Sequence, residues 1–244
     1  MKKQLIFRLC ACLLVALYNL PMMSQGVIVY QKDGTKVKYP YEQIDSIVTY
    51  NNGEDAEDRP VTTYEAIDLG LSVKWASFNV GATSPEEYGG YYAWGETEEK
   101  SSYTIDNYKY FNSSTGGYEY EKLGSNISGT SYDVARVKWG GSWRMPTLSE
   151  MQELCSECSW QWTEVNGVKG QKVTGPNGNS IFLPAAGSCE GTEVDGHGSN
   201  GLYWSATWIE DDIIGTCWLS FYSRYWSCTN NGCWNGKSVR PVTE

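Results

Sequence analysis

Residues Gly201–Val242 have the sequence GLYWSATWIEDDIIGTCWLSFYSRYWSCTNNGCWNGKSVRPV, and this stretch largely decides how the chain folds. It holds five of the eleven tryptophans and three of the eight cysteines. From Cys217 to Ser223, apolar residues recur at every second position, which is typical of a β-strand with one covered face. The pattern predicts that Cys217, Leu219 and Phe221 face the core.

The opposite set of this alternation predicts an outward aromatic face. Continued along the chain, it consists of Trp218, Ser220, Tyr222, Arg224 and Trp226. Aromatic and guanidinium side chains are enriched at binding hot spots, so we predict a ligand-binding surface here. The complete predicted site comprises Trp208, Trp218, Tyr222, Arg224, Tyr225, Trp226, Asn230, Asn231 and Trp234. The alternative is that a loop or a second sheet covers this face.

Residues 1–24 have the composition of an export signal. Lys2, Lys3 and Arg8 precede or flank a mostly apolar run, Leu9–Leu20, and a plausible cleavage point follows it. The run is shorter than the roughly 18 to 20 apolar residues of a membrane-spanning helix. We therefore expect an exported chain without a membrane span, located in the periplasm, on the cell surface or in the medium.

The composition is acidic and rich in turn-forming residues. The formal charge is −10, and loss of the leader with its three cations would leave 16 basic against 29 acidic residues. An acidic surface argues against nucleic acid or anionic lipid as a partner, because both require a basic surface. The 26 glycines and 18 tyrosines favour a strand-rich domain with many loops.

The chain is predicted to contain two structured parts. Residues 26–50 form a small β-hairpin module, with a turn at Asp33-Gly34 and a further strand at 46–50. Residues 51–60, NNGEDAEDRP, are polar and acidic and form the linker. The main domain extends over 61–244, and its segment 98–130, rich in Ser, Gly, Asn and Tyr, is predicted to be a long surface excursion.

One helix in the main domain is well specified. Thr147 and Glu150 form a capping box, and Met151, Leu154, Cys155 and Cys158 then recur at helical spacing. Residues 168–173 and 180–183 flank a turn, GPNG, and predict a hairpin. Strands, one capped helix and many loops indicate an α+β domain.

Residues with catalytic or metal-binding chemistry are few. Six cysteines follow the leader, and they permit up to three disulfides in 15 pairings. Cys155 and Cys158 have redox or zinc spacing, but they fall at a helix C-terminal end, which favours buried thiols or a disulfide. The single histidine, His197, lies in a glycine-rich loop. Residues 210–212 are a weak calcium candidate. We therefore predict no catalytic residues, no metal and no cofactor.

An ordered set of motifs resembles the Fibrobacter succinogenes major paralogous domain family, exported bacterial domains common in Bacteroidetes. The motifs are LGLSVKWA at 69–76, NVGA at 79–82, YAWGET at 92–97, WGGSWRMPT at 139–147, FLPAAG at 182–187, YWS at 203–205 and SVRPV at 238–242. The resemblance spans about residues 64–242. It implies a C-type-lectin-like fold in which the terminal strands come together and the C-terminal strands and loops present a ligand face.

The resemblance also assigns roles to single residues. It implies that Trp75, Trp94, Trp143, Arg144, Pro146, Trp204 and Arg240 belong to the scaffold. Family members often have a cysteine where this chain has Phe78, so the resemblance implies Cys155 as a substitute partner for Cys158. The calcium-type sugar-binding signatures of animal lectins are absent. Related domains are targets of diversity-generating retroelements, so residues 207–235 are also a candidate diversified region.

Four functions follow as hypotheses. The first is an exported, non-enzymatic module that binds a glycan or a protein, and the second is the same module with a diversified C-terminal region. The third is a structural or fimbria-associated surface component without a small ligand. The fourth is a hydrolase, for which the sequence offers no supporting constellation of residues. The sequence leaves the oligomeric state open.

Overall fold

The computed structural model describes residues 26–30, 36–40, 64–112, 119–121, 123–209, 215–230 and 232–244. It contains two compact units, Met1–Val61 and Thr62–Glu244, which are described separately. The predicted leader, the strand at 46–50 and the linker at 51–60 lie outside the described residues. In the first unit, β1 (Gly26–Tyr30) pairs antiparallel with β2 (Lys36–Pro40), as the predicted hairpin requires.

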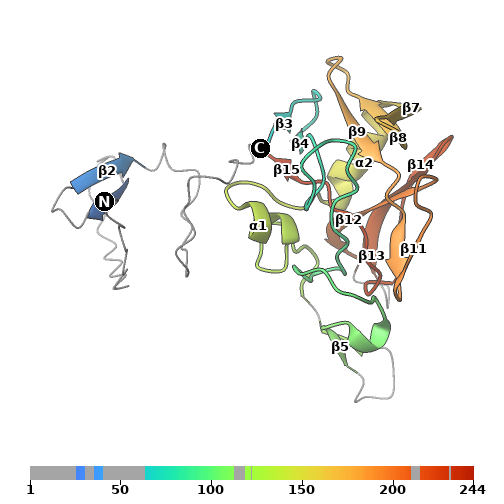
Figure 1. Ribbon diagram of the computed structural model, residues 1–244, viewed down its shortest axis with the longest axis horizontal. Coiled ribbons are helices and arrows are strands. Elements are labelled where there is room, and N and C mark those ends of the chain that lie inside the picture. The colour runs from blue at the N-terminus through green and yellow to red at the C-terminus, as the bar shows by residue number, and fades with distance from the viewer. Residues whose placement is uncertain are drawn as a thin grey trace, which may run out of the picture. The chain divides into compact units, whose positions relative to one another are not determined.

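The second unit is rich in β-sheet, with short strands and few helices (Figure 1). Its class is α+β, as predicted. Its elements in chain order are β3 (Ala66–Ile67), β4 (Lys74–Ala76), the 3-10 helix η3 (Ile105–Asn107), β5 (Phe111–Asn112), β6 (Glu119–Tyr120), α1 (Val134–Trp139), α2 (Leu148–Glu157), β7 (Ser159–Val165), β8 (Val168–Thr174), β9 (Ser180–Pro184), β10 (Ser188–Glu190), β11 (Glu193–Asp195), β12 (Gly201–Trp208), β13 (Thr216–Tyr222), β14 (Tyr225–Asn230) and β15 (Val242–Thr243).

Strands from the two ends of this unit pair with each other. β15 pairs antiparallel with β4, which in turn pairs with β3. The buried guanidinium of Arg240 reinforces this closure, because it donates to Asn79 Oδ1, to the carbonyl oxygen of Ala76 and to that of Phe182 at 2.8, 3.0 and 2.9 Å. Three acceptors from two separate segments, one at the end of β4 and one on β9, therefore depend on one side chain next to the C-terminal strand.

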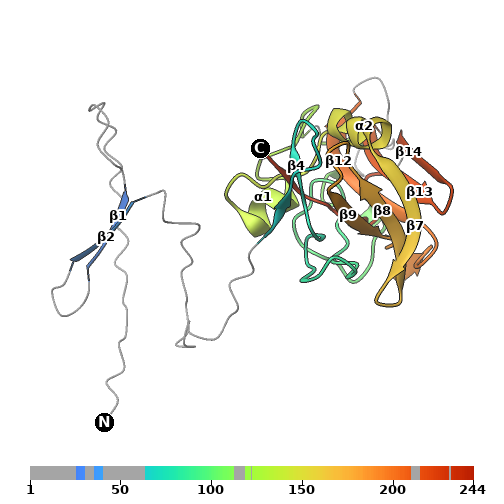
Figure 2. The ribbon, with the colours of Figure 1, turned by 90° about the horizontal axis from the view of Figure 1, so that it is seen from above.

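Helix α2 forms as the sequence predicts. Its N-cap Thr147 accepts from the Glu150 N–H, and Glu150 accepts from the Thr147 N–H, which completes the capping box. Met151 and Leu154 are fully buried, so the helix places its apolar face on the sheet formed by β12, β13 and β14. Figure 2 shows the helix close to these strands. Cys158 is the C-cap residue, which confirms its place at the end of the helix.

The predicted hairpin at 168–183 is present, within a larger sheet. β8 pairs antiparallel with β9, and β7 pairs with the other edge of β8. β7 was not predicted from the sequence, and its half-buried Trp160 and Trp162 pack against the core. Their alternation with polar residues over Ser159–Val165 was the signal that could have identified the strand.

The sheet β12-β13-β14 separates two clusters of buried side chains. One cluster includes Trp94, Trp204, Trp218 and Val239. The other includes Trp75, Leu154, Tyr203, Leu219 and Phe221. Because clusters lie against both faces, β13 is buried from Thr216 to Phe221. The predicted core residues Cys217, Leu219 and Phe221 are buried.

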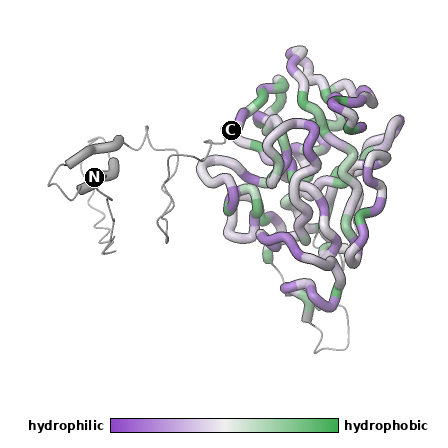
Figure 3. Tube along the Cα trace, viewed as in Figure 1, coloured by the Kyte–Doolittle hydropathy of each residue, from purple (hydrophilic) through white to green (hydrophobic). Residues whose placement is uncertain are grey.

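The described residues of segment 98–130 are largely exposed or half-buried, as a surface excursion requires, but four of its side chains anchor it in the core, which was not predicted. Tyr103, Tyr108, Tyr110 and Ile127 within it are at most 6% exposed and belong to the core. Tyrosine can bury its ring when its hydroxyl finds a partner. The hydroxyl of Tyr108 donates to the carbonyl oxygen of Trp94 at 2.8 Å. Hydropathy alone gives little warning, since short hydrophobic stretches alternate with hydrophilic ones throughout this unit (Figure 3).

Candidate ligand-binding surface

The turn between β13 and β14 presents the most exposed aromatic side chains in the described part of the chain. Tyr222 and Tyr225 face each other as a cross-strand pair, and Ser223 and Arg224 form the turn between them. The tyrosines are 48% and 56% exposed, and their ring centroids are 6.4 Å apart. Arg224 is also exposed. We call Tyr222, Arg224 and Tyr225 the hairpin tip.

The hairpin register corrects the predicted outward face. In an antiparallel pair, residues opposite each other point to the same side of the sheet. Trp226 is opposite Phe221, so it points to the side of Phe221 and not to the side of Trp218. The prediction assumes one continuous strand through Ser223 and Arg224. The chain reverses at these two residues, so the alternation of side chains between the two faces of the sheet does not continue unchanged past them. Trp226 is half-buried against the second core cluster.

Trp218 was predicted to face outward, but it is only 6% exposed. Its ring meets the edge of Trp204 at 5.5 Å between centroids, and the ammonium of Lys237 lies 4.2 Å from its ring centroid. Ser220, the next residue of the predicted face, is also buried. The alternative interpretation, a covered face, is therefore correct for most of β13.

Two residues outside the predicted site support the hairpin tip. Gln171 of β8 donates its side-chain N–H to the carbonyl oxygen of Tyr222 at 2.7 Å. Trp160 of β7 stacks on Trp226, with centroids 5.4 Å apart and ring planes 7° apart. Both contacts join separate strands, so no local sequence pattern identifies them. They hold the two strands that carry the exposed tyrosines.

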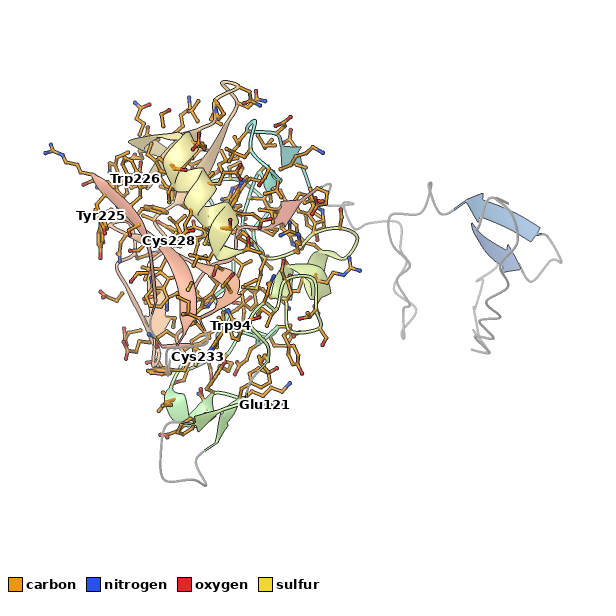
Figure 4. The ribbon with its side chains drawn as sticks, turned by 180° about the vertical axis from the view of Figure 1, so that it is seen from behind. Trp94, Glu121, Tyr225, Trp226, Cys228 and Cys233 are labelled. Atoms are coloured by element: carbon orange, nitrogen blue, oxygen red, sulfur yellow. The ribbon has the colours of Figure 1, made fainter. Side chains whose placement is uncertain are left out.

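The remaining predicted residues lie at the opposite end of the same sheet. Trp208 is paired with Thr216, and Asn230 with Cys217, so both are at the far end of β13 from Tyr222. Trp208 and Trp234 are half-buried against the first core cluster, and the ring centroids of Trp208 and Trp94 are 5.4 Å apart. At about 3.3 Å per residue, β13 separates the two ends by about 20 Å. Figure 4 shows Tyr225 and Trp226 at one end, and Cys233 and Trp94 toward the other.

The side chain of Asn230 and the whole of Asn231 lie outside the described residues. So do residues 210–212, the weak calcium candidate. Within the described ranges, no cluster of three or more His, Cys, Asp or Glu side chains is arranged to hold a metal ion. The structure therefore brings together Tyr222, Arg224 and Tyr225, and it separates them from Trp208 and Trp234.

Most of the residues assigned to the scaffold by the family resemblance lie within the core. Trp75, Trp94, Trp204 and Arg240 are at most 1% exposed. Arg144 is half-buried and forms a two-point ion pair with Glu150, at 2.9 and 2.7 Å. The four core residues are inaccessible to a ligand, as the scaffold interpretation requires, whereas Trp143 and Arg144 are half-buried.

The single histidine packs against an aromatic ring. The ring of His197 lies 3.9 Å from that of Tyr88, measured between centroids. Cys155 and Cys158 do not form a disulfide, and none of the six described cysteines is in one. Burial raises the pKa of Cys158 to about 11, so this thiol lacks the lowered pKa of a reactive redox pair.

Two hollows, of about 480 and 450 Å³, open elsewhere on the domain. The first is lined by charged and tyrosine side chains that include Glu96, Lys100 and Tyr110, and the second by Ile67, Thr163 and Phe182 among others. Neither contains any of the nine predicted site residues. The hairpin tip lies outside both hollows, and its exposed side chains are suited to shallow contact with a large ligand.

Comparison with known proteins gives no independent identification. No family model, no curated protein and no solved structure matches this chain. Among the described helices, none has the length and apolar character needed to cross a membrane.

Proposed function

We propose that this chain is an exported, non-enzymatic ligand-binding module whose C-type-lectin-like domain contacts its ligand through the hairpin tip. The observation that carries the proposal is the exposure of Tyr222 and Tyr225 on a hairpin whose base is firmly packed. Single exposed apolar residues are common, but two adjacent tyrosines with an arginine between them form a concentrated aromatic surface.

The chemistry of the hairpin tip suits a glycan or a protein ligand. Tyrosine provides a large, rigid contact area at low cost in conformational entropy, and its hydroxyl can hydrogen-bond at a wet interface. Its ring can also stack on the apolar face of a sugar. Arg224 adds a cation to a chain that is acidic overall, which favours ligands with carboxylate or carbonyl oxygens near the aromatic contact.

The lectin-like fold is part of the proposal and has three supports. The motif set extends over most of the second unit, the terminal strands β4 and β15 pair, and the motif residues Trp75, Trp94 and Trp204 form the core. Export is supported by the composition of residues 1–24. The proposed contact involves no metal, because aromatic rings and a guanidinium can bind a ligand directly.

The test is a screen of the purified chain against a glycan array and a panel of host surface proteins, with calcium or with a chelator. A variant with Tyr222→Ser, Arg224→Ser and Tyr225→Ser should lose at least tenfold in affinity for any ligand found. Its melting temperature should change little, because these side chains are exposed. The matched control is Val137→Ser with Val194→Ser, which replaces side chains exposed by 48% and 42% elsewhere on the domain.

Three outcomes would contradict the proposal. The first is equal binding by the tip variant and the wild type. The second is loss of binding on chelation alone, which would move the site to residues 210–212. The third is an absence of ligands together with a solution mass that rises with concentration, which would favour the structural, fimbria-associated alternative.

A further inference from the structure

The C-terminal half of α2 lies against β14, and each contributes one cysteine to the contact. Cys155 is on α2 and Cys228 is on β14, and both are half-buried against the second core cluster. The indole N–H of Trp226 donates to the carbonyl oxygen of Cys155 at 3.3 Å, which fixes the helix to this strand. Cys228 lies beside the helix (Figure 4).

The two thiols lie on facing surfaces of this contact. Cys228 is opposite Leu219 and Trp226 is opposite Phe221, so Cys228 and Trp226 point to the same side of the sheet, and Trp226 reaches the backbone of Cys155 on α2. Interaction between the two thiols raises the pKa of Cys155 and lowers that of Cys228, which favours the thiolate of Cys228 over that of Cys155. Cys228 is therefore the first nucleophile of the pair.

Cys158 is placed differently, although it is three residues from Cys155. It caps α2, and its pKa is raised by burial and then by the negative charges of Glu153 and Glu157. These conditions disfavour its thiolate. The spacing of Cys155 and Cys158 suggested a pair in the sequence, but the contact in the fold is between Cys155 and Cys228.

We propose that Cys155 and Cys228 are an oxidative cross-link site, at which a disulfide joins α2 to β14. Disulfides need side chains that approach closely from correctly oriented backbones, and α2 packs on β14 with both cysteines at the same core cluster. This site is independent of the hairpin tip and does not require that the chain bind a ligand.

The oxidant can be a low-molecular-weight disulfide such as glutathione disulfide. The Cys228 thiolate attacks one glutathione sulfur, forming a mixed disulfide and releasing a glutathione thiolate. Cys155 loses its proton and attacks the Cys228 sulfur, and a second glutathione thiolate leaves. Two protein thiols are thereby oxidised to one disulfide, the glutathione disulfide is reduced to two glutathiones, and the two protons end on these products.

The cross-link should stabilise the folded domain. It closes a chain loop of about 70 residues, and loops of this length restrict the unfolded state strongly. For a domain of this size, we expect the melting temperature of the oxidised chain to exceed that of the reduced chain by about 5–10 °C.

The test begins with the fully reduced chain, incubated with glutathione disulfide, alkylated and digested without reductant. Mass spectrometry should find the peptides of Cys155 and Cys228 linked, with the other thiols alkylated. A predominant link from Cys155 to Cys158, or from Cys228 to Cys233, would overturn the proposal. Full alkylation of both Cys155 and Cys228 after incubation would also overturn it.

Substitutions separate the cross-link from a general effect on folding. Cys158→Ser should retain the link and the gain in melting temperature, whereas Cys228→Ser should lose both. If Cys228→Ser does not fold, the peptide map of the wild type still decides the identity of the pair. An equal gain in melting temperature on oxidation of Cys228→Ser would assign that gain to a different disulfide.

Discussion

Lys237 and Arg224 are both cations beside two aromatic residues, but they occupy opposite environments. Lys237 is 2% exposed, and its ammonium lies 4.0 and 4.2 Å from the ring centroids of Trp204 and Trp218. Arg224 lies in an exposed turn between Tyr222 and Tyr225. We call the first group the buried cage, and the second is the hairpin tip.

The comparison shows that aromatic and cationic composition does not distinguish a core from a binding surface. Both groups are on the same hairpin sheet or packed against it, and Trp218 and Tyr222 are on the same strand four residues apart. The difference comes from what covers each position. Trp204 and the segment that carries Lys237 cover Trp218, whereas Tyr222 lies at the end of β13, next to the turn into β14.

The largest effect should come from comparing two arginines. Arg240→Met removes the donor for three buried oxygens, and unsatisfied buried acceptors cost about 1–3 kcal/mol each. We expect a loss of about 4 kcal/mol or more in the free energy of unfolding. Arg224→Met should change it by less than about 0.5 kcal/mol. Urea titrations of both variants measure the difference, and similar losses would refute the distinction.

A smaller difference should separate two aromatic residues of β13. Trp218→Ala opens a cavity beside Trp204 and should cost about 3–5 kcal/mol, within the range for large core truncations. Tyr222→Ala should cost less than about 1 kcal/mol, because half of the side chain is already in water. Thermal and urea unfolding would check this prediction. A loss above about 3 kcal/mol for Tyr222→Ala would place this tyrosine in the core.

The smallest effect concerns pH. Burial lowers the pKa of Lys237 to about 7, although Cys233 and Glu190 lie near enough to raise it. Between pH 7 and 9, the unfolded chain holds the lysine proton and the folded chain has largely released it. Raising the pH therefore stabilises the folded state through this group, and lowering the pH through 7 removes the contribution.

Lys237→Met keeps most of the side-chain volume and removes the titration. The difference in stability between the variant and the wild type should therefore be largest near pH 7, in favour of the variant, and should shrink toward pH 9. Urea titrations at four pH values would measure it. A difference that stays constant with pH would mean that Lys237 does not change its protonation state in this range.

Local patterns predicted the elements that local interactions stabilise. The capping box of Thr147 and Glu150 correctly located α2, and the turn GPNG correctly located the hairpin of β8 and β9. The period-2 pattern correctly placed Cys217, Leu219 and Phe221 of β13 in the core, although the opposite face is also covered. Each of these signals depends on neighbours within a few residues, so the sequence contains the required information.

The errors concern residues whose environment comes from distant segments. Trp226 lies on the face of the sheet opposite to the predicted one, because the chain reverses at Ser223 and Arg224. Trp218 is buried by Trp204 and Lys237. Tyr103, Tyr108 and Tyr110 are in the core because their hydroxyls reach backbone carbonyls far along the chain or across a turn. The partners Gln171 and Trp160 of the candidate site were missed for the same reason.

The sequence by itself determined the α+β class, the main helix, the burial of Cys217, Leu219 and Phe221 and the acidic composition, because periodicity, capping and charge are properties of neighbouring residues. The tertiary structure alone decided which aromatic residues reach solvent and which thiols meet. Exposure is what remains after all other segments have packed, and contact between Cys155 and Cys228 depends on how α2 docks on β14. For this reason the candidate surface narrowed from nine residues to Tyr222, Arg224 and Tyr225.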